Sequence, residues 1–221
     1  MEIKEAIGLG YSRMAEKVYV SDAFYNECLA IEKNYFGDIL DIGCGQGVVL
    51  KKLKEKFGDK IKTLTGIELS KKLLEMAGKN IPEARLLIAD AENLPFGDNS
   101  FDFVIMIDVF QYLLDFDKAL EEIKKVLRPN GKFIVTAPNR EWILFNDYIK
   151  KRKNIQPLED HFFDFEEMAG LLEKHNFKIL KYRGADCLRY YAPYHKYEML
   201  LAKVFPWLHK KMKKIIFLVR P

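Results

Sequence analysis

One short stretch of the chain constrains its fold more than any other. The apolar run 38–42 contains the acid Asp41 and predicts a buried strand. Three glycines follow it at alternate positions: Gly43, Gly45 and Gly47. Residues 48–53 then show the apolar and basic spacing of an amphipathic helix. A strand, a glycine turn and a helix N-terminus let the backbone approach a nucleotide-like ligand closely.

The spacing of the glycines limits the class of ligand. Pyrophosphate-binding turns carry Gly-x-Gly-x-x-Gly, and P-loops carry a lysine after their last glycine. The stretch from Gly43 to Gly47 is Gly-x-Gly-x-Gly and has neither feature. The turn therefore suits a ligand without phosphates.

Apolar runs alternate with helical patterns along the rest of the chain, which predicts βαβ units and a parallel sheet. Strands are expected at 38–42, 62–67, 85–89, 102–107, 132–137 and 176–183, and the short run 215–219 is rich in strand formers. Helices are expected at 47–57, 70–79, 115–128 and 164–175. Pro129, Asn130 and Gly131 predict a turn that ends the third of these helices.

The glycine turn also carries a resemblance to a known family. Asp41-x-Gly43-Cys44-Gly45-x-Gly47 resembles the first motif of the class I S-adenosylmethionine-dependent methyltransferases, in particular the small-molecule, type 11-like group. Further segments match the family in order: 67–70, 89–96, 100–104 and 126–132, the last with Asn130 replacing the first glycine of an L-x-P-G-G turn. The resemblance extends from residue 36 to residue 183.

The resemblance implies a fold for the whole chain. The fold class is α/β, with a Rossmann-like seven-stranded sheet that is mostly parallel, a last strand that is antiparallel, helices on both faces and helical lid insertions. Residues 1–221 are expected to form one domain, in which 1–35 are an N-terminal helical cap. Segments 139–163 and 184–213 are expected to be lid or substrate insertions, and 215–219 the final strand.

The same resemblance implies S-adenosylmethionine as the cofactor, with a protein group for each of its parts. Asp41 would attract the ammonium of the amino-acid head, and Glu68 would accept hydrogen bonds from the ribose hydroxyls. Leu69 would cover one face of the adenine. Asp90 would accept the exocyclic amine, and the backbone of Ala91 would meet a ring nitrogen.

The other expected cofactor contacts lie in the glycine turn and after the fourth strand. They are Gly43, Cys44, Gly45 and Gly47 beside the methionine portion, and Ile107 and Asp108 at the pocket wall. Cys44 is expected to be a small motif residue and not a nucleophile, because no histidine partner is indicated near it.

Tyr112 and His161 are the candidate catalytic residues. Tyr112 stands where many members of the resembled family carry a histidine, and a phenol with a pKa of about 10 is a poor base at neutral pH. His161 resembles the histidine that precedes the helix after the lid in small-molecule O-methyltransferases; the alternative is a surface histidine beside an N-cap at Asp164. Asp108 and Asn139 match a catechol-type metal site only in part, so no metal is expected.

Composition argues against several other classes of protein. No apolar run approaches the length that spans a bilayer, and the N-terminus does not resemble a signal peptide. The spacings of Cys28, Cys44 and Cys187 fit neither a disulfide framework nor a metal site. We therefore expect a cytoplasmic protein.

The charge is uneven along the chain. The formal net charge is +4, and from His195 onward six lysines and Arg220 oppose the single acid Glu198, which leaves that segment at +6 and the remainder at −2. Nucleic-acid binders usually carry a broad basic face, whereas this is a local patch, so nucleic acid is not an expected partner.

Two aromatic, amphipathic stretches, 142–149 and 190–208, indicate either a lid packed on the core or an apolar acceptor pocket. The expected function is methyl transfer to a small, apolar or aromatic acceptor at oxygen, with a peripheral contact to a membrane surface through the basic residues. The alternatives are an RNA methyltransferase that uses the basic C-terminal segment, and a non-catalytic partner protein that binds the cofactor. The sequence does not indicate an oligomeric state.

Overall fold

The computed structural model describes residues 4, 8–10, 22–142, 161–185, 209–210 and 212–221. About half of the predicted cap and most of the two predicted insertions lie outside the described residues. The described strands are β1 (Gly37–Ile42), β2 (Ile61–Glu68), β3 (Arg85–Ile88), β4 (Phe101–Met106), β5 (Leu127–Pro138), β6 (Lys178–Ala185) and β7 (Lys214–Arg220). The described helices are α2 (Asp22–Leu29), α3 (Val48–Phe57), α4 (Lys71–Asn80), α5 (Phe116–Val126) and α7 (Phe165–Lys174), with 3₁₀ turns at Gly58–Lys60 and Phe110–Tyr112.

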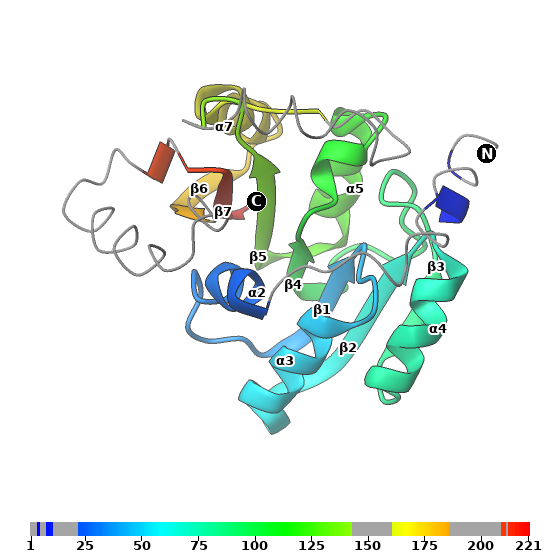
Figure 1. The fold of residues 1–221 in the computed structure, drawn as a ribbon. Coiled ribbons are helices and arrows are strands. Elements are labelled where there is room, and N and C mark those ends of the chain that lie inside the picture. The colour runs from blue at the N-terminus through cyan, green and yellow to red at the C-terminus, as the bar shows by residue number, and fades with distance from the viewer. Residues whose placement is uncertain (1–3, 5–7, 11–21, 143–160, 186–208, 211) are drawn as a thin grey trace.

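The strands form a seven-stranded sheet in the order β3-β2-β1-β4-β5-β7-β6 (Figure 1). β1 pairs parallel with β2 and β4, β2 with β3, and β4 with β5. β7 runs antiparallel to both β5 and β6. The predicted fold class and the predicted last strand at 215–219 are therefore confirmed.

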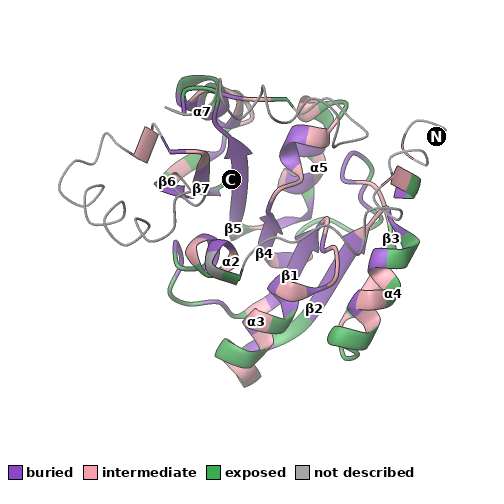
Figure 2. Ribbon diagram, in the orientation of Figure 1, coloured by how far each residue is buried: buried purple, intermediate pink, exposed green. Residues whose placement is uncertain are grey.

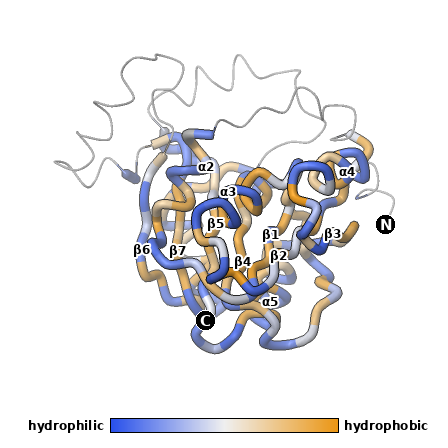
Figure 3. Tube along the Cα trace, turned by 90° about the horizontal axis from the view of Figure 1, so that it is seen from below, coloured by the Kyte–Doolittle hydropathy of each residue, from blue (hydrophilic) through white to orange (hydrophobic). Residues whose placement is uncertain are grey.

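Helices cover both faces of the sheet because parallel strands need crossover connections, which are usually helical. Successive residues of β4 show the two faces: Phe103 packs with α2 and α3, and Val104 packs with α5 and α7. Figure 2 shows the strands buried between helices that expose their outer sides, and Figure 3 shows hydrophobic positions gathered along the central strands. None of the described helices is long and apolar enough to cross a membrane.

Three helices begin at residues whose side chains cap them. Ser70 Oγ accepts a hydrogen bond from Leu73 N (3.3 Å), and Asp115 Oδ1 accepts one from Lys118 N (3.0 Å). Asp164 Oδ1 accepts one from Glu167 N (2.8 Å), so the expected N-cap at Asp164 is confirmed. Each cap satisfies a backbone N–H that the first turn of a helix leaves unpaired.

The predicted turn at 129–131 is wrong as a boundary between helix and strand. Helix α5 ends at Val126, two residues before the predicted end, and β5 already begins at Leu127. Leu127 pairs with Phe101 of β4, and Ser100 N donates to Val126 O (2.8 Å). Cross-strand pairing therefore takes the chain into the sheet before the Pro-Asn-Gly segment, where the ladder shifts register.

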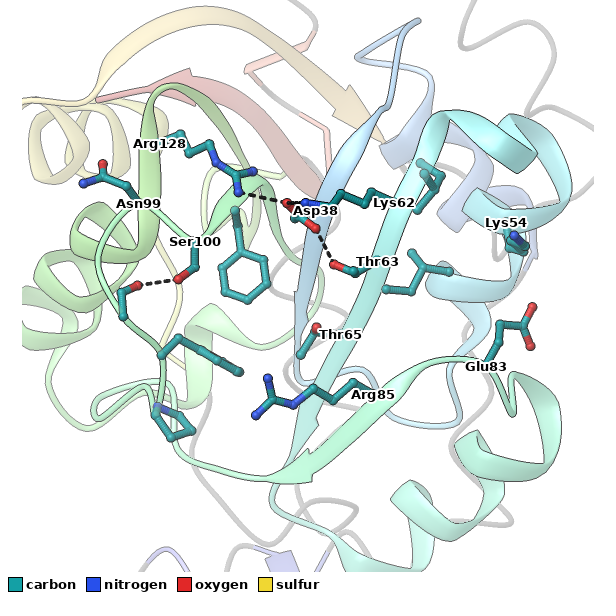
Figure 4. Close-up of a pocket in the computed structure, with 16 residues that line it drawn as sticks. Asp38, Lys54, Lys62, Thr63, Thr65, Glu83, Arg85, Asn99, Ser100 and Arg128 are labelled. Atoms are coloured by element: carbon teal, nitrogen blue, oxygen red, sulfur yellow. Dashed lines mark hydrogen bonds and ion pairs between the residues drawn. The ribbon is translucent and has the colours of Figure 1, made fainter.

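An ion-pair network joins the amino ends of the strands (Figure 4). Arg128 Nη2 lies 2.8 Å from Asp38 Oδ2, and Arg128 Nη1 lies 2.5 Å from Asp102 Oδ2. Thr63 Oγ1 donates to Asp38 Oδ1 (2.7 Å). Burial acts to raise the pKa of Asp38, but hydrogen bonds from Thr63 and Arg128 outweigh it, so that the pKa lies below its ordinary value.

The same residues border an open hollow of about 720 Å³ at this end of the sheet (Figure 4). The connection from β3 to β4 contains no helix, and its Phe96 and Ser100 line the hollow. Because Arg128 pairs with Asp38 and Asp102, and Thr63 donates to Asp38, the network links β1, β2, β4 and β5.

We expect Arg128→Met to lower the free energy of unfolding by about 2 kcal/mol at neutral pH, since it removes the cation beside Asp102 and leaves Asp38 with the more distant Lys62, at 3.8 Å. Because the pKa of Asp38 is lowered by folding, its carboxylate stabilises the folded protein at pH values above about 4, the pKa of an aspartate in the unfolded chain. This stabilisation is lost as the pH falls through the lower pKa of Asp38 in the folded protein. The variant should therefore lose less stability than the wild type between about pH 7 and pH 3.5. Urea denaturation measures both effects.

Lys125→Met is the matched control, because Lys125 is half-exposed and its ion pair is with Glu122, one turn away on α5. Equal effects of the two substitutions would show that the network contributes nothing specific.

Candidate functional site

A cavity of about 160 Å³ lies at the opposite edge of the sheet, where the parallel strands end. Open α/β sheets bind ligands at this edge. The lining residues come from the ends of β1 to β4 and the loops after them, from α2, α4, the 3₁₀ turn at 110–112 and the N-terminus: Lys4, Tyr25, Ile42, Gly43, Gly45, Ile67, Glu68, Leu69, Leu73, Ala89, Asp90, Ala91, Glu92, Ile107, Asp108, Val109, Tyr112 and Leu113.

The glycine turn is fixed to the neighbouring strand by its backbone. Gly43 N and Cys44 N both donate to Ile67 O, at 2.8 and 3.0 Å. Gly43 has φ +69°, and a Cβ there would lie 2.2 Å from Val109 Cγ2, so only glycine fits. At Gly45 (φ +52°) a Cβ would meet no atom of the described residues within 4 Å, so these residues leave the backbone at this position open to an approaching ligand.

Gly47 serves a different purpose in the same turn. It begins α3 with φ +78°, and a Cβ there would lie 2.9 Å from Ile81 Cγ2 and 3.2 Å from Ala77 Cβ. Gly47 therefore allows close packing against the end of α4 and does not line the cavity.

Two acids lie beneath and beside the turn. Glu68 accepts hydrogen bonds from Gly45 N (3.1 Å) and Ser70 N (2.9 Å), but its burial outweighs them and raises its pKa. Asp41 is only 2% exposed, and its Oδ2 has no hydrogen-bond partner among the described residues. Burial and the nearby Glu68 raise the pKa of Asp41 well above its ordinary value. A buried, unpartnered carboxyl of this kind fits a ligand that brings a cation or a donor.

The loop after β3 brings a second pair of acids to the cavity. Asp90 Oδ1 accepts a hydrogen bond from Glu92 N (3.0 Å), and Glu92 Oε1 accepts one from Leu114 N (2.8 Å). Lys4 Nζ lies 2.5 Å from Asp90 Oδ2 and 2.6 Å from Glu92 Oε2. Sequence reasoning did not assign a role to Lys4 or Glu92; the one signal for Glu92 is its position within the matched segment 89–96.

The wall after β4 is held by contacts from several elements. Asp108 is a non-glycine residue with φ +60°, and its N–H donates to Thr136 Oγ1 (2.9 Å). Its carboxylate pairs with Lys214 Nζ, which also lies 4.8 Å from the centroid of the Phe24 ring. The unusual backbone conformation is thus fixed by neighbouring strands, as is common at functional sites. Lys214 was not predicted from the sequence.

The cavity brings together most of the cofactor contacts that the sequence predicts. Those that line it are Gly43, Gly45, Glu68, Leu69, Asp90, Ala91, Ile107 and Asp108, joined by the catalytic candidate Tyr112. Asp41, Cys44 and Gly47 lie behind the lining. Burial, followed by Asp41 and Glu68, raises the pKa of Cys44, so its thiol stays protonated at neutral pH.

His161 is not brought to the cavity wall. The backbone N–H of His161 donates to Gln111 O (3.2 Å). The half-exposed ring of His161 packs on Phe116 and Phe163, with ring centroids 5.1 and 4.5 Å away. Glu167 Oε1 lies 3.7 Å from His161 Nε2. His161 therefore lies outside the cavity lining, although its backbone contacts Gln111, the residue before Tyr112. A catalytic role for His161 or Tyr112 stays a prediction.

The residues present fit the cofactor that the sequence resemblance implies. The open backbone at Gly45 leaves room beside the unpartnered Asp41, and Glu68 and Asp90 lie at the ends of successive strands along the cavity. Each expected part of the ligand therefore has a group of the right chemistry at this edge. Asn139, by contrast, donates to Lys210 O and Met212 O and is engaged away from Asp108.

Comparison with known proteins agrees with the geometry. A family model described as a methyltransferase domain matches residues 40–135. The chain is 30% identical over 158 residues to the sterol 4-C-methyltransferase strm-1 of Caenorhabditis elegans, a match that covers 69% of this chain and 41% of that protein. The matches to the first curated relatives span between 36% and 65% of those proteins' lengths.

Solved structures share the fold at lower identity. An S-adenosylmethionine-dependent methyltransferase from Mesorhizobium loti has a TM-score of 0.71 at 17% identity, covering 91% of this chain and 99% of that one. Phosphoethanolamine N-methyltransferase 2 of Haemonchus contortus, in complex with S-adenosyl-L-methionine, has a TM-score of 0.64 at 19% identity, covering 98% of this chain and 57% of that one.

We expect Gly43→Ala to destabilise the protein more than Gly45→Ala. Both positions have positive φ and carry a backbone penalty of about 1 kcal/mol, but only the Gly43 variant also forces a methyl group into Val109. An additional loss of about 1 to 3 kcal/mol for the first variant follows from overpacking. Chemical denaturation measures the difference, and equal losses would show that Val109 yields without cost.

Proposed function

The chain belongs to the class I S-adenosylmethionine-dependent methyltransferases, and on that premise we propose that it transfers a methyl group from this cofactor to a small, apolar or aromatic acceptor at oxygen. The observation that carries the proposal is the buried Asp41 beneath the glycine turn, whose Oδ2 has no hydrogen-bond partner in the described part of the chain, with Glu68 beside it. We also propose a cytoplasmic location, since Cys28 and Cys44 are both free and buried.

The acids at the cavity and behind its lining divide the cofactor between them. Asp41 attracts the ammonium of the amino-acid head from behind the lining, because its buried Oδ2 has no hydrogen-bond partner among the described residues. Glu68 keeps its two backbone hydrogen bonds and uses its remaining lone pairs for the ribose hydroxyls. Asp90 accepts the exocyclic amine of the adenine, and Leu69 and Ala91 line the space beside it.

When bound, the cofactor supplies an electrophilic methyl group on a sulfonium. The residues of the chain then have to align the acceptor with that group and exclude water, and alignment alone can supply much of the rate enhancement. Apolar side chains at the cavity wall, Ile107, Val109 and Leu113, favour a dry site.

The acceptor side of the cavity is close to neutral. The charge of Asp108 is offset by Lys214. Burial, followed by Asp108 and Asp41, raises the pKa of Tyr25, which therefore remains a neutral phenol that can donate a hydrogen bond. A neutral wall with Tyr25 and Tyr112 suits an apolar or aromatic acceptor better than a cationic amine. This balance of charge supports a hydroxyl oxygen as the methylated atom.

Calorimetric titration with S-adenosylmethionine and S-adenosylhomocysteine tests the cofactor part. We expect saturable binding of both, weakened at least about tenfold in Glu68→Ala because two hydrogen bonds to a charged group are lost. Glu173→Ala, at an exposed position on α7, is the matched control and should bind like the wild type. A folded wild type that binds neither compound would contradict the proposal.

Transfer of a labelled methyl group tests the acceptor. The arms are phenols and other small aromatic hydroxyl compounds, a sterol, phosphoethanolamine and tRNA, and the expected product is a methyl ether. Tyr112→Phe and His161→Gln report whether either residue handles the acceptor's proton. Methylation of only the amine, the sterol or the tRNA would contradict the proposed acceptor class while leaving the cofactor site intact.

We expect cofactor binding to release protons through Asp41. The free protein has a raised pKa at Asp41, and an ammonium partner favours the carboxylate, so affinity should rise with pH above the ordinary carboxyl range while the ligand's ammonium stays protonated. Titration in buffers of different ionisation enthalpy counts the protons. Asp41→Asn should bind more weakly and release fewer of them, and Glu68→Gln separates the contribution of Glu68; unchanged release in Asp41→Asn would contradict the assignment.

A further inference from the structure

We propose that Lys4 is a positioning residue of the adenine end of the cavity, where its ammonium holds Asp90 as the acceptor of the exocyclic amine. The inference rests on the proposed function and adds to it a residue from the N-terminus, far from every motif that the sequence matches. Lys4 acts through Asp90 and sets the preference for a 6-amino over a 6-oxo base.

The geometry around Lys4 is a bridge between two carboxylates. Lys4 Nζ lies 2.5 Å from Asp90 Oδ2 and 2.6 Å from Glu92 Oε2. The side chain of Lys4 is only 19% exposed, and Lys4, Asp90 and Glu92 all line the cavity. A lysine with so little exposure that bridges two acids is less screened by water than an ordinary surface ion pair.

The two carboxylates need such a cation because they lie close together. Asp90 Oδ2 and Glu92 Oε2 both contact the ammonium of Lys4, and Glu92 is nearly buried, with 8% of its side chain exposed. Like charges at this separation repel strongly when water is largely excluded. Glu92 cannot turn away, since its other oxygen accepts hydrogen bonds from Leu114 N (2.8 Å) and Asp115 N (3.2 Å).

The bridge leaves Asp90 able to bind the base. A carboxylate offers about four acceptor positions. Asp90 uses one for Glu92 N, through Oδ1, and one for Lys4, through Oδ2. The remaining positions accept a hydrogen bond from an exocyclic amine but repel the carbonyl of a 6-oxo purine. Lys4 therefore supports amine recognition and does not compete with it.

A second described part of the N-terminus contacts the neighbouring loop. A Cβ at Gly8 would lie 2.6 Å from Leu69 O, so the backbone at Gly8 packs directly on the residue that follows Glu68. Lys4 and Gly8 thus contact the two successive loops that hold the base and the ribose in the proposed function.

The test is calorimetric binding of S-adenosylhomocysteine and S-inosylhomocysteine, which differ at position 6 of the purine. The wild type should prefer the adenosine compound by at least about tenfold. Lys4→Met should weaken binding of the adenosine compound by about tenfold and that of the inosine compound much less, so that the preference shrinks. Lys4→Arg should keep both the affinity for the adenosine compound and the preference for it over the inosine compound, because arginine retains the positive charge.

Lys174→Met is the matched control, since Lys174 is an exposed lysine of α7 paired with Asp117 away from the cavity. Equal weakening of both compounds in Lys4→Met would reduce Lys4 to a structural role and overturn the inference. Tighter binding of the adenosine compound would overturn it as well, by making Lys4 a competitor. A wild type that binds neither compound would instead reject the proposed function, on which the inference rests.

Discussion

The parallel pairing of β1 with β2 and β4 is the constraint on which the site depends. Asp41 stands opposite Gly66 on one side and Ile105 on the other, so three strands end at one edge. Gly66 is required there, because a Cβ would lie 2.8 Å from Cys44 Sγ. This close fit turns the glycine loop toward the cavity and leaves Asp41 beneath it, out of contact with water. The burial of Asp41 therefore follows from the register in which β1 pairs with its two neighbouring strands.

Much of the fold and of the cavity could be predicted from the sequence, because both depend on local patterns. Apolar runs of strand length are bounded by turns, and acids such as Glu68 and Asp90 come directly after such runs. Parallel strands align these positions at one edge, whatever their separation along the chain. The error at residues 127–131 arose because Leu127 pairs with β4, and such pairing is decided by tertiary contacts.

The basic partners of the acids could not be predicted. Lys4 meets Asp90 across 86 residues, and Lys214 meets Asp108 across 106. No spacing rule relates such pairs, and lysines are common throughout the chain. The sequence shows where negative charge gathers, and only the structure shows which cations offset it. The position of His161 in the sequence resembles that of a family histidine, but its ring packs on an aromatic side chain and lies outside the cavity lining. The resemblance in sequence was therefore not enough to predict where this side chain lies.

The reversed direction of β7 has a consequence for how this domain can diversify. Ala185 at the end of β6 pairs with Lys214 at the start of β7, and Pro138 at the end of β5 pairs with the same lysine. Asn139 and Phe163 form a bridge beside them. The connection from β6 to β7 thus leaves and re-enters the sheet at the cavity edge. The connection from β5 leaves at the same edge and returns to it at Phe163, before α7 leads to the start of β6. Segments of very different length could be exchanged between these anchor points without disturbing the ladder, so the chain length between strands can change while the scaffold stays constant.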